Sequence, residues 1–357
     1  MLVIGVLLAL GTVDASFAAS AAQAISPTPR AAAKERGMAA SNSVPADAAN
    51  LAILRRLLNE PEGQVDLARA KVTIDHMVDP KVDVEGTLGL LDQWAAKIRA
   101  RFPPGASNKA KINLLVSTLY ESGPWNDHRP FGYDFSDPYG RDPNNTLLST
   151  YLARRKGQCV IMPIAIVLLG QKLGLPVTMT TAPYHLIVKY GDEEIGQWTN
   201  LEATSGRFYA DSGYEQALRI PSEAIKNDTF MRPYTQKESV ALFATASLAP
   251  LYKERRQPES LLQLTNLLLK ANPKDVIAIT PRADAYYLLL EQRLLSKYPS
   301  VDQMPPAALE ELKSLSGQNR ELYSKAEALG WKAWTKADWD RYLDHFANQK
   351  SKLQRDE

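Results

Sequence analysis

The stretch KGQCVIMPIAIVLLGQKLGLP, residues 156–176, contains the only cysteine of the 357-residue chain, Cys159. From Val160 to Leu169 almost every side chain is apolar, which is typical of a helix that is buried on most of its sides. Cys159 stands where this helix is expected to begin. A helix N-terminus stabilises a thiolate, and the thiolate is the nucleophilic form of cysteine. The sequence therefore places a candidate nucleophile at the start of a buried helix.

A strand-like segment after this helix supplies a candidate base. The run VTMTTAPYHLIVKY, residues 177–190, is rich in β-branched and aromatic side chains and predicts a strand. With a period of two, His185, Ile187 and Lys189 share one face of this strand, and the residues between them share the other. An imidazole close to a thiol can take its proton, so His185 is the candidate general base.

The next segment supplies two candidates for a third residue. The turn signal GDEE, residues 191–194, separates the first run from IGQWTNLEAT, residues 195–204, so an antiparallel hairpin is expected. On the second strand Trp198, Asn200 and Glu202 share one face. An amide or carboxylate oxygen can accept the Nδ1–H of an imidazole and hold the ring in place. Asn200 and Glu202 are therefore both candidates for this role.

The order of these motifs resembles the transglutaminase-like superfamily of papain-type thiol enzymes. That family has G-x-C opening a helix, LG-[IL]-P at its end, H-x-x-[IV] on a strand and W…D-x-T on the next. This chain has GQC, LGLP, HLIV and WTNLEAT in the same order. The resemblance implies Cys159 as nucleophile, His185 as base and Glu202 as the group that orients the histidine. Glu202 stands where the family has Asp, with Asn200 as a papain-like alternative.

A closer resemblance covers roughly residues 65–290. The run DPNNTLLSTYLARRKGQCVIMPIAIVLLGQKLGLPV looks like a bacterial branch in which a transglutaminase-like core precedes tetratricopeptide-type helices. That branch often lacks the cysteine, whereas this chain has both Cys159 and His185. The resemblance implies a cysteine hydrolase or acyltransferase that acts on a peptide or amide bond through a Cys159 thioester. The alternative is a catalytically silent scaffold that binds a protein partner through its C-terminal helices.

The candidate residues also have structural interpretations. A lone cysteine before an apolar helix is commonly a small buried hydrophobe. Gln158 precedes the thiol, and we expect it near the oxyanion site, where the backbone N–H of Cys159 would be the main donor. Trp198 is expected to pack in the core and is kept as a weak candidate for a substrate contact.

The composition excludes several classes of function. Hydrophobic residues are 45% and charged residues 23% of the chain, as in soluble globular proteins, and a net charge of +2 does not indicate a nucleic-acid partner. A single cysteine excludes an intramolecular disulfide and a cysteine-based metal cage. The aspartates between residues 127 and 142 lack the spacing of an EF-hand loop. We therefore expect no metal and no cofactor; the resemblance described above implies a peptide or protein substrate.

The N-terminus predicts export. Residues 1–24 resemble a secretory signal, with the apolar run MLVIGVLLAL and an Ala-Gln-Ala cleavage site, although no basic residue precedes the run. The run is shorter than the ~20 residues of a membrane span. We expect an exported protein, periplasmic or secreted, whose mature chain has no integral membrane segment.

The remaining segments predict an α+β fold. Residues 25–48 are rich in Ala, Ser and Pro and indicate a flexible linker. Residues 49–234 would form the papain-like, transglutaminase-like core, in which helices precede the buried helix and its antiparallel sheet. Residues 235–357 predict a helical region, with a tetratricopeptide-like helix pair around KANPKD and ADAYYLLL. In the scaffold alternative, this region would bind the protein partner.

Overall fold

The computed structural model describes residues 43–137, 142–342 and 344. The predicted signal peptide, residues 1–24, lies outside the described residues, as does the predicted linker up to residue 42. The last part of that linker is helical, because helix α3 begins at Ser43. No helix in the described part of the chain combines the length and the apolar character needed to cross a membrane.

Helices α3 to α6 precede the candidate site in the sequence. Their bounds are α3 (Ser43–Asn59), α4 (Leu67–Val78), α5 (Val84–Arg99) and α6 (Asn108–Tyr120). Aspartates begin two of them: Asp66 accepts a hydrogen bond from the amide of Arg69, and Asp83 accepts one from the amide of Gly86. These side chains satisfy backbone N–H groups that have no partner within the first turn of a helix.

A short parallel pair of strands lies directly before the turn that contains Cys159. Helix α7 (Leu148–Arg154) ends at Arg155, which takes a left-handed conformation with φ 58°. Gly157 lies in β2 (Lys156–Gly157), which pairs with β1 (Gly132–Tyr133). Gly157 is required for space, since a Cβ atom there would lie 2.5 Å from the ring of Tyr151.

Helix α8 (Ile161–Lys172) is buried along most of its length. Every residue from Ile161 to Gly170 is buried. Pro163 is accommodated because it lies in the first turn, where an amide hydrogen would have no partner within the helix. The helix contacts α5, α6 and α7 on one side and β3 and β4 on the other. The predicted buried helix is therefore confirmed.

The sheet against α8 has four antiparallel strands in sequential order. They are β3 (Val177–Ala182), β4 (His185–Asp192), β5 (Gln197–Glu202) and β6 (Arg207–Tyr209). The prediction of one strand over residues 177–190 was wrong, because the chain turns at Pro183 and Tyr184 and pairs Ala182 with His185. The turn lies within a run that is rich in β-branched and aromatic residues, so Pro183 was its only signal in the sequence.

The two faces of β4 pack against different cores. Leu186, Val188 and Tyr190 belong to the large core around α8, whereas Ile187 belongs to a smaller cluster on the opposite face. This confirms the predicted alternation of the strand. The smaller cluster includes Tyr214, so it leads to the candidate site.

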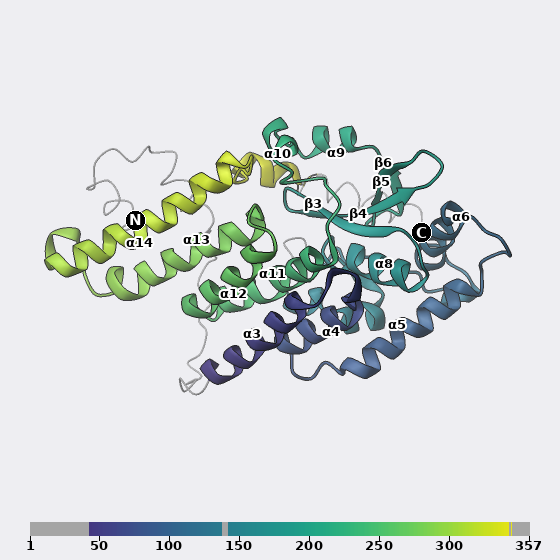
Figure 1. The fold of residues 1–357 in the computed structure, drawn as a ribbon, viewed down its shortest axis with the longest axis horizontal. Coiled ribbons are helices and arrows are strands. Elements are labelled where there is room, and N and C mark those ends of the chain that lie inside the picture. Colours follow the sequence, from purple (N-terminus) through teal and green to yellow (C-terminus); the bar gives the residue numbers. More distant parts are fainter. Residues whose placement is uncertain (1–42, 138–141, 343, 345–357) are drawn as a thin grey trace.

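The remaining helices follow the sheet in the sequence. Their bounds are α9 (Asp211–Ala217), α10 (Ser222–Lys226), α11 (Gln236–Glu254), α12 (Pro258–Ala271), α13 (Val276–Leu290) and α14 (Pro306–Ala328). Thr235 and Glu238 form a capping box at the start of α11. Figure 1 shows α11 to α14 at one end and the sheet at the other, and α3 and α4 pack against α11. The fold is α+β, with helical regions before and after the sheet.

A buried ion pair connects α4 to the start of α7. Lys71 and Asp75 pair within α4, and both side chains are almost fully buried. The Lys71 ammonium also donates to the carbonyl oxygen of Thr146 (2.8 Å), and Asp75 accepts a hydrogen bond from the amide of Leu148 (2.9 Å). The pair therefore fixes the backbone that precedes the Cys159 segment.

Replacing Lys71 by methionine should destabilise the fold strongly. The substitution leaves Asp75 buried without its cation, and we expect the free energy of unfolding to fall by about 3–5 kcal/mol. Urea denaturation measures this change. Arg69→Ala, on the same helix, is the control: it removes an exposed ion pair with Glu85 and should change the stability much less than Lys71→Met does. Equal effects of the two substitutions would contradict the structural role of the buried pair.

Candidate functional site: a Cys159–His185–Glu202 cluster

Cys159 lies in the turn that leads into α8. It is partly buried and stands two residues before Ile161, the first residue of the helix. The amide of Met162 donates to the carbonyl oxygen of Gln158 (3.1 Å), so the chain already curves into the first turn at this point. Among the described residues, no carbonyl oxygen accepts the Cys159 N–H. The thiol and its amide therefore lie at the N-terminal end of the buried helix.

His185 lies between Cys159 and Glu202. Its Nε2 atom is 2.7 Å from Oε2 of Glu202, and its ring also interacts with Cys159, which favours protonation of the imidazole. Since Nε2 faces the carboxylate, Nδ1 is the nitrogen left for the thiol. We expected the third residue to hold Nδ1, and the structure reverses the two nitrogens. The order of contacts along the cluster is thiol, imidazole and carboxylate.

The register of the sheet explains why Glu202 reaches the imidazole. Val188 pairs with Leu201, so extending the register by one pair puts Glu202 opposite Ile187. His185 lies two residues from Ile187 on the same face, which makes Glu202 its diagonal neighbour. Diagonal neighbours have Cα atoms ~7–8 Å apart, a distance that long side chains can bridge. The extra methylene of glutamate fits this diagonal contact.

The Glu202 carboxylate accepts hydrogen bonds on both oxygens. Oε1 accepts from the amide (3.0 Å) and the hydroxyl (2.6 Å) of Thr204, in the turn after β5. Oε2 accepts from the hydroxyl of Tyr214 on α9 (2.9 Å), in addition to its contact with His185. Neither Thr204 nor Tyr214 was a predicted site residue, although Thr204 is part of the quoted motif. These donors fix the carboxylate in its charged form.

The two charged groups stabilise each other. Burial opposes ionisation of Glu202, but the charge of His185 and the hydrogen bonds from His185 and Thr204 outweigh it, and they lower the pKa of Glu202 to about 2. Burial also opposes protonation of His185. The charge and hydrogen bond of Glu202, together with the interaction with Cys159, outweigh this effect and raise the pKa of His185 to about 10. At neutral pH the site therefore holds an imidazolium beside the thiol, an arrangement that favours the thiolate.

Asn200 is engaged elsewhere. Its side chain is buried, and Nδ2 donates to the carbonyl oxygen of Tyr209 (3.1 Å) and to Oδ1 of Asp211 (2.5 Å). The same Asp211 oxygen accepts from the ammonium of Lys189 (2.8 Å), which pairs with Asn200 in the sheet. The two candidates for the third residue thus differ in geometry: Glu202 contacts His185, and Asn200 connects β5 to the start of α9.

The two weaker candidates lie in different surroundings. Gln158 is buried, and its Nε2 donates to the carbonyl oxygen of Asp137, so it connects the Cys159 turn to the preceding loop. Trp198 is 44% exposed, so the expectation that it packs in the core was wrong. It lies four residues before Glu202 on the same strand, a distance of ~13 Å along the sheet. Trp198 therefore does not belong to the cluster around Cys159.

Two tyrosines near the thiol and one beside His185 were missed in the sequence. Tyr133 on β1 and Tyr342 in the C-terminal segment are hydrogen-bonded to each other. Burial and a nearby charge at Cys159 raise the pKa of Tyr133, so this ring lies near the thiol. Tyr184 directly precedes His185 and has a left-handed backbone with φ 56°. A left-handed conformation is uncommon for a large side chain, and such conformations are concentrated at functional sites.

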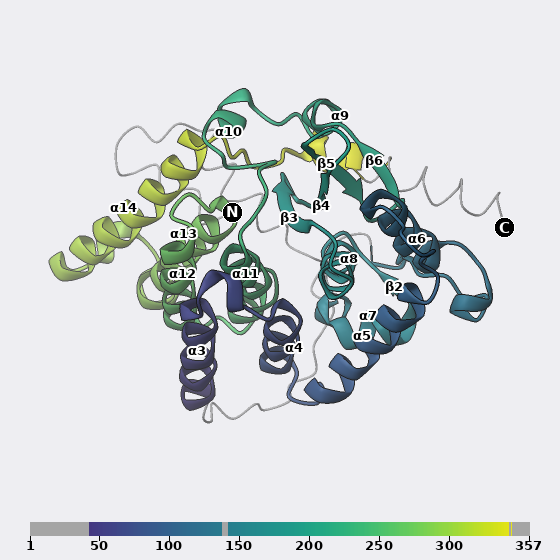
Figure 2. The ribbon, with the colours of Figure 1, turned by 45° about the vertical axis from the view of Figure 1, so that its right-hand side comes forward.

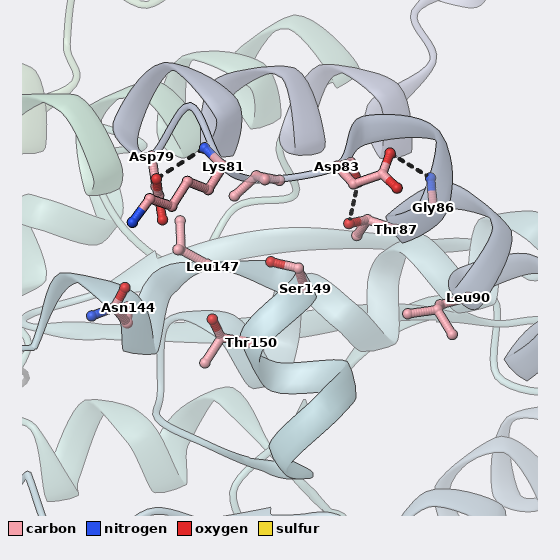
Figure 3. Close-up of a pocket in the computed structure, with 11 residues that line it drawn as sticks. Asp79, Lys81, Asp83, Gly86, Thr87, Leu90, Asn144, Leu147, Ser149 and Thr150 are labelled. Carbon is pink, nitrogen blue, oxygen red and sulfur yellow. Dashed lines mark hydrogen bonds between the residues drawn. The ribbon is translucent and has the colours of Figure 1, made fainter.

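A separate cavity of about 360 Å³ lies between the start of α5 and the start of α7 (Figure 3). Asp83 lines this cavity. Its carboxylate accepts a hydrogen bond from the amide of Gly86, and its backbone carbonyl oxygen accepts one from the hydroxyl of Thr87. None of Cys159, His185 and Glu202 lines this cavity. Among the residues that the structure describes, no cluster of three or more His, Cys, Asp or Glu side chains is arranged to hold a metal ion.

Replacing Glu202 by glutamine should reduce stability most between about pH 4.5 and 6.5. The pKa of His185 rises from 6.5 to about 10, so its contribution is complete below pH 6.5 and is lost as the pH rises through 10. The pKa of Glu202 falls from 4.5 to about 2, so its contribution is complete above pH 4.5 and is lost as the pH falls through 2. Between pH 4.5 and 6.5 we expect Glu202→Gln to lower the free energy of unfolding by about 3 kcal/mol, and urea denaturation at several pH values measures this change.

The matched control for this pH series is Glu85→Gln, which changes an exposed glutamate in an exposed ion pair. It should leave the free energy of unfolding nearly unchanged at every pH, because solvent screens an exposed ion pair. A Glu202→Gln difference that stays constant from pH 4 to pH 10 would refute the assigned ion pair.

The comparisons with known proteins agree with this geometry. Residues 86–241 match the family model of the transglutaminase-like superfamily, and this range contains Cys159, His185 and Glu202. The match ends within α11, so the tetratricopeptide-like character of the later helices stays a prediction. No curated protein matches the chain.

One solved structure with some likeness is a crystal structure of menin, described as revealing its binding site for the Mixed Lineage Leukemia protein. The alignment covers 84% of this chain and 88% of that chain, with 15% sequence identity and a TM-score of 0.36. At that score the likeness supports no statement about fold or function. The family match shows that residues 86–241 are similar to the transglutaminase-like superfamily, and this range includes the sheet and the buried helix α8.

Proposed function

We propose that this protein is a cysteine-dependent hydrolase or acyltransferase that acts on a peptide or amide bond through a thioester at Cys159. The observation that carries the proposal is the position of His185, whose Nε2 atom is 2.7 Å from the Glu202 carboxylate and whose pKa is raised in part by Cys159. A general base that is itself oriented by a carboxylate is the arrangement that activates a weak nucleophile. The match to the transglutaminase-like superfamily supports a cysteine-based site in this range.

The first half-reaction forms the acyl-enzyme. The Cys159 thiolate attacks the carbonyl carbon, and the carbonyl oxygen becomes an oxyanion that the Cys159 N–H stabilises. Collapse of this tetrahedral intermediate breaks the C–N bond. Nδ1 of His185 then gives its proton to the leaving amine, which departs neutral. The acyl group stays on sulfur as a thioester, and Glu202 holds the imidazole in position throughout.

The second half-reaction restores the thiolate. Water or an amine attacks the thioester carbon, and neutral His185 accepts its proton. The C–S bond breaks, and Cys159 leaves as a thiolate beside the re-formed imidazolium. Attack by water makes the protein a hydrolase, and attack by an amine makes it an acyltransferase. Both reactions use the same three residues of the chain.

The alternative is a catalytically silent scaffold whose C-terminal helices bind a protein partner. A scaffold does not need a carboxylate with four hydrogen-bond partners beside an imidazole, and these are the contacts of Glu202. The charges at the site therefore favour the enzyme. Export to the periplasm or the medium would give such an enzyme access to peptides and cell-envelope components, and this localisation is part of the proposal.

The pH dependence of thiol alkylation tests the activated thiolate. An ordinary cysteine has a pKa near 8.5, so at pH 6 only about 0.3% of it is thiolate. We expect iodoacetamide to alkylate Cys159 readily at pH 6, and His185→Ala to slow the reaction at least about tenfold, because the imidazolium is gone. Mass spectrometry of the single cysteine measures the rate.

The control for alkylation is His128→Gln, which changes an exposed histidine outside the cluster and should leave the rate unchanged. If the folded protein reacts only near pH 8.5 and above, with the same rate profile in the His185 variant, Cys159 has an ordinary thiol and the enzyme assignment fails.

An activated ester tests for the acyl-enzyme directly. With p-nitrophenyl acetate we expect a burst of about one nitrophenolate per chain, followed by slower turnover, as for enzymes with a covalent intermediate. Cys159→Ser should abolish the burst. Addition of a primary amine such as glycine ethyl ester should accelerate turnover if the protein is an acyltransferase, and leave it unchanged if it is a hydrolase. A burst that survives in Cys159→Ser would exclude the thioester.

A further inference from the structure

The chain returns to the candidate site after α14. The helix ends at Ala328, and the carbonyl oxygen of Leu329 accepts a hydrogen bond from the Thr229 hydroxyl (2.8 Å). Gly330 follows with φ 94°, and a Cβ atom there would lie 2.5 Å from the amide nitrogen of Ala224 on α10. The close approach fixes the point at which the chain leaves α14. From there it runs toward the sheet, as the yellow end of the described chain beside α9 shows in Figure 2.

Residues 331–342, here called the C-terminal aromatic segment, pack on the residue beside the catalytic histidine. The ring of Trp334 lies 4.3 Å from the ring of Tyr184, and the ring of Trp339 lies 5.6 Å from it. The two tryptophan rings contact each other at 4.9 Å. Tyr184 directly precedes His185. These distances are those of favourable aromatic pairs, so the segment is attached to the turn that presents His185.

The same segment reaches the thiol. The ring of Tyr342 lies 5.7 Å from the ring of Trp334 and 6.1 Å from the ring of Trp339, in the helical stretch that begins at residue 336. Its hydroxyl is hydrogen-bonded to Tyr133, and both tyrosines lie within electrostatic reach of Cys159. The segment therefore extends from the histidine side of the cluster to the cysteine side.

The attachment of this segment is weak compared with the core. Its outward side is charged and exposed, with 81% of the Lys336 side chain and 54% of the Asp340 side chain accessible in a mutual ion pair. Trp334, Trp339 and Tyr342 are only partly buried. Segments with few buried contacts open at low free-energy cost. The segment can therefore leave the surface while the domain stays folded.

We propose that the C-terminal aromatic segment is an intramolecular cover of the Cys159–His185 site, which must move aside before an acyl donor reaches the thiol. This inference rests on the proposed function of that site. Tyr184 is its fixed attachment point, Trp334 and Trp339 hold it there, and Tyr342 closes it over Cys159. A reagent larger than the covered opening reacts only with the fraction of molecules in which the segment has moved away.

The test compares the access of two thiol reagents in the full chain. At pH 9 an ordinary thiol is mostly ionised, so the rate reports access and does not require His185. Iodoacetamide is the small probe, and 5,5′-dithiobis(2-nitrobenzoate) is the large probe, whose thionitrobenzoate product is measured by absorbance. Removing two ring contacts raises the open fraction, so we expect Trp334→Ala/Trp339→Ala to raise the rate with the large probe about tenfold and with iodoacetamide less.

The matched control is Lys336→Ala, which changes an exposed side chain of the C-terminal aromatic segment and should leave both rates unchanged. If the double variant fails to fold by circular dichroism, Trp339→Leu replaces it, since leucine keeps an apolar side chain and removes the ring contacts. An unchanged rate with the large probe would refute the proposal that the segment covers the site. A lower rate would also refute it and would indicate that the segment is a fixed part of the site wall. Because the assay needs no activated thiolate, it can succeed even where the pH profile refutes the proposed function.

Discussion

The burial of α8 on all sides is the constraint on which the rest of the structure depends. A helix whose residues from Ile161 to Gly170 are all buried needs neighbours in every direction. Helices α5, α6 and α7 cover one side, and strands β3 and β4 cover the other. The first turn of α8 is the place where this apolar core ends. Cys159 therefore lies at the edge of the core, close to groups from both layers.

The sheet contributes the charges that the core itself could not hold. A buried carboxylate is costly unless it is paired and hydrogen-bonded, and Glu202 accepts donors from Thr204, Tyr214 and His185. Each donor comes from a different element: the turn after β5, helix α9 and the start of β4. The ionised state of the pair at neutral pH is thus a property of the assembled sheet and α9. The thiol gains an adjacent cation because the carboxylate keeps the imidazole protonated.

The C-terminal part of the chain completes the surroundings of the site. Trp331 packs on the same small cluster as Ile187 and Tyr214, so the segment that follows it starts from a fixed position near the sheet. Tyr184 is held in a left-handed conformation at the tip of the β3–β4 turn, where it meets Trp334. Access to Cys159 is therefore governed by contacts between residues about 150 positions apart in the sequence.

The sequence alone determined the buried helix, the position of Cys159 before it and the alternation of β4, because these follow from periodicity within one element. It also identified His185 and limited the third residue to Asn200 or Glu202. It could not choose between them, since both lie on one face of β5, and only the register with β4 makes Glu202 the diagonal neighbour of His185. The tertiary structure alone decided the turn inside residues 177–190, the donors Thr204 and Tyr214, and the approach of Tyr342 to the thiol. These contacts join separate elements, and their geometry depends on packing, which leaves no local pattern in the sequence.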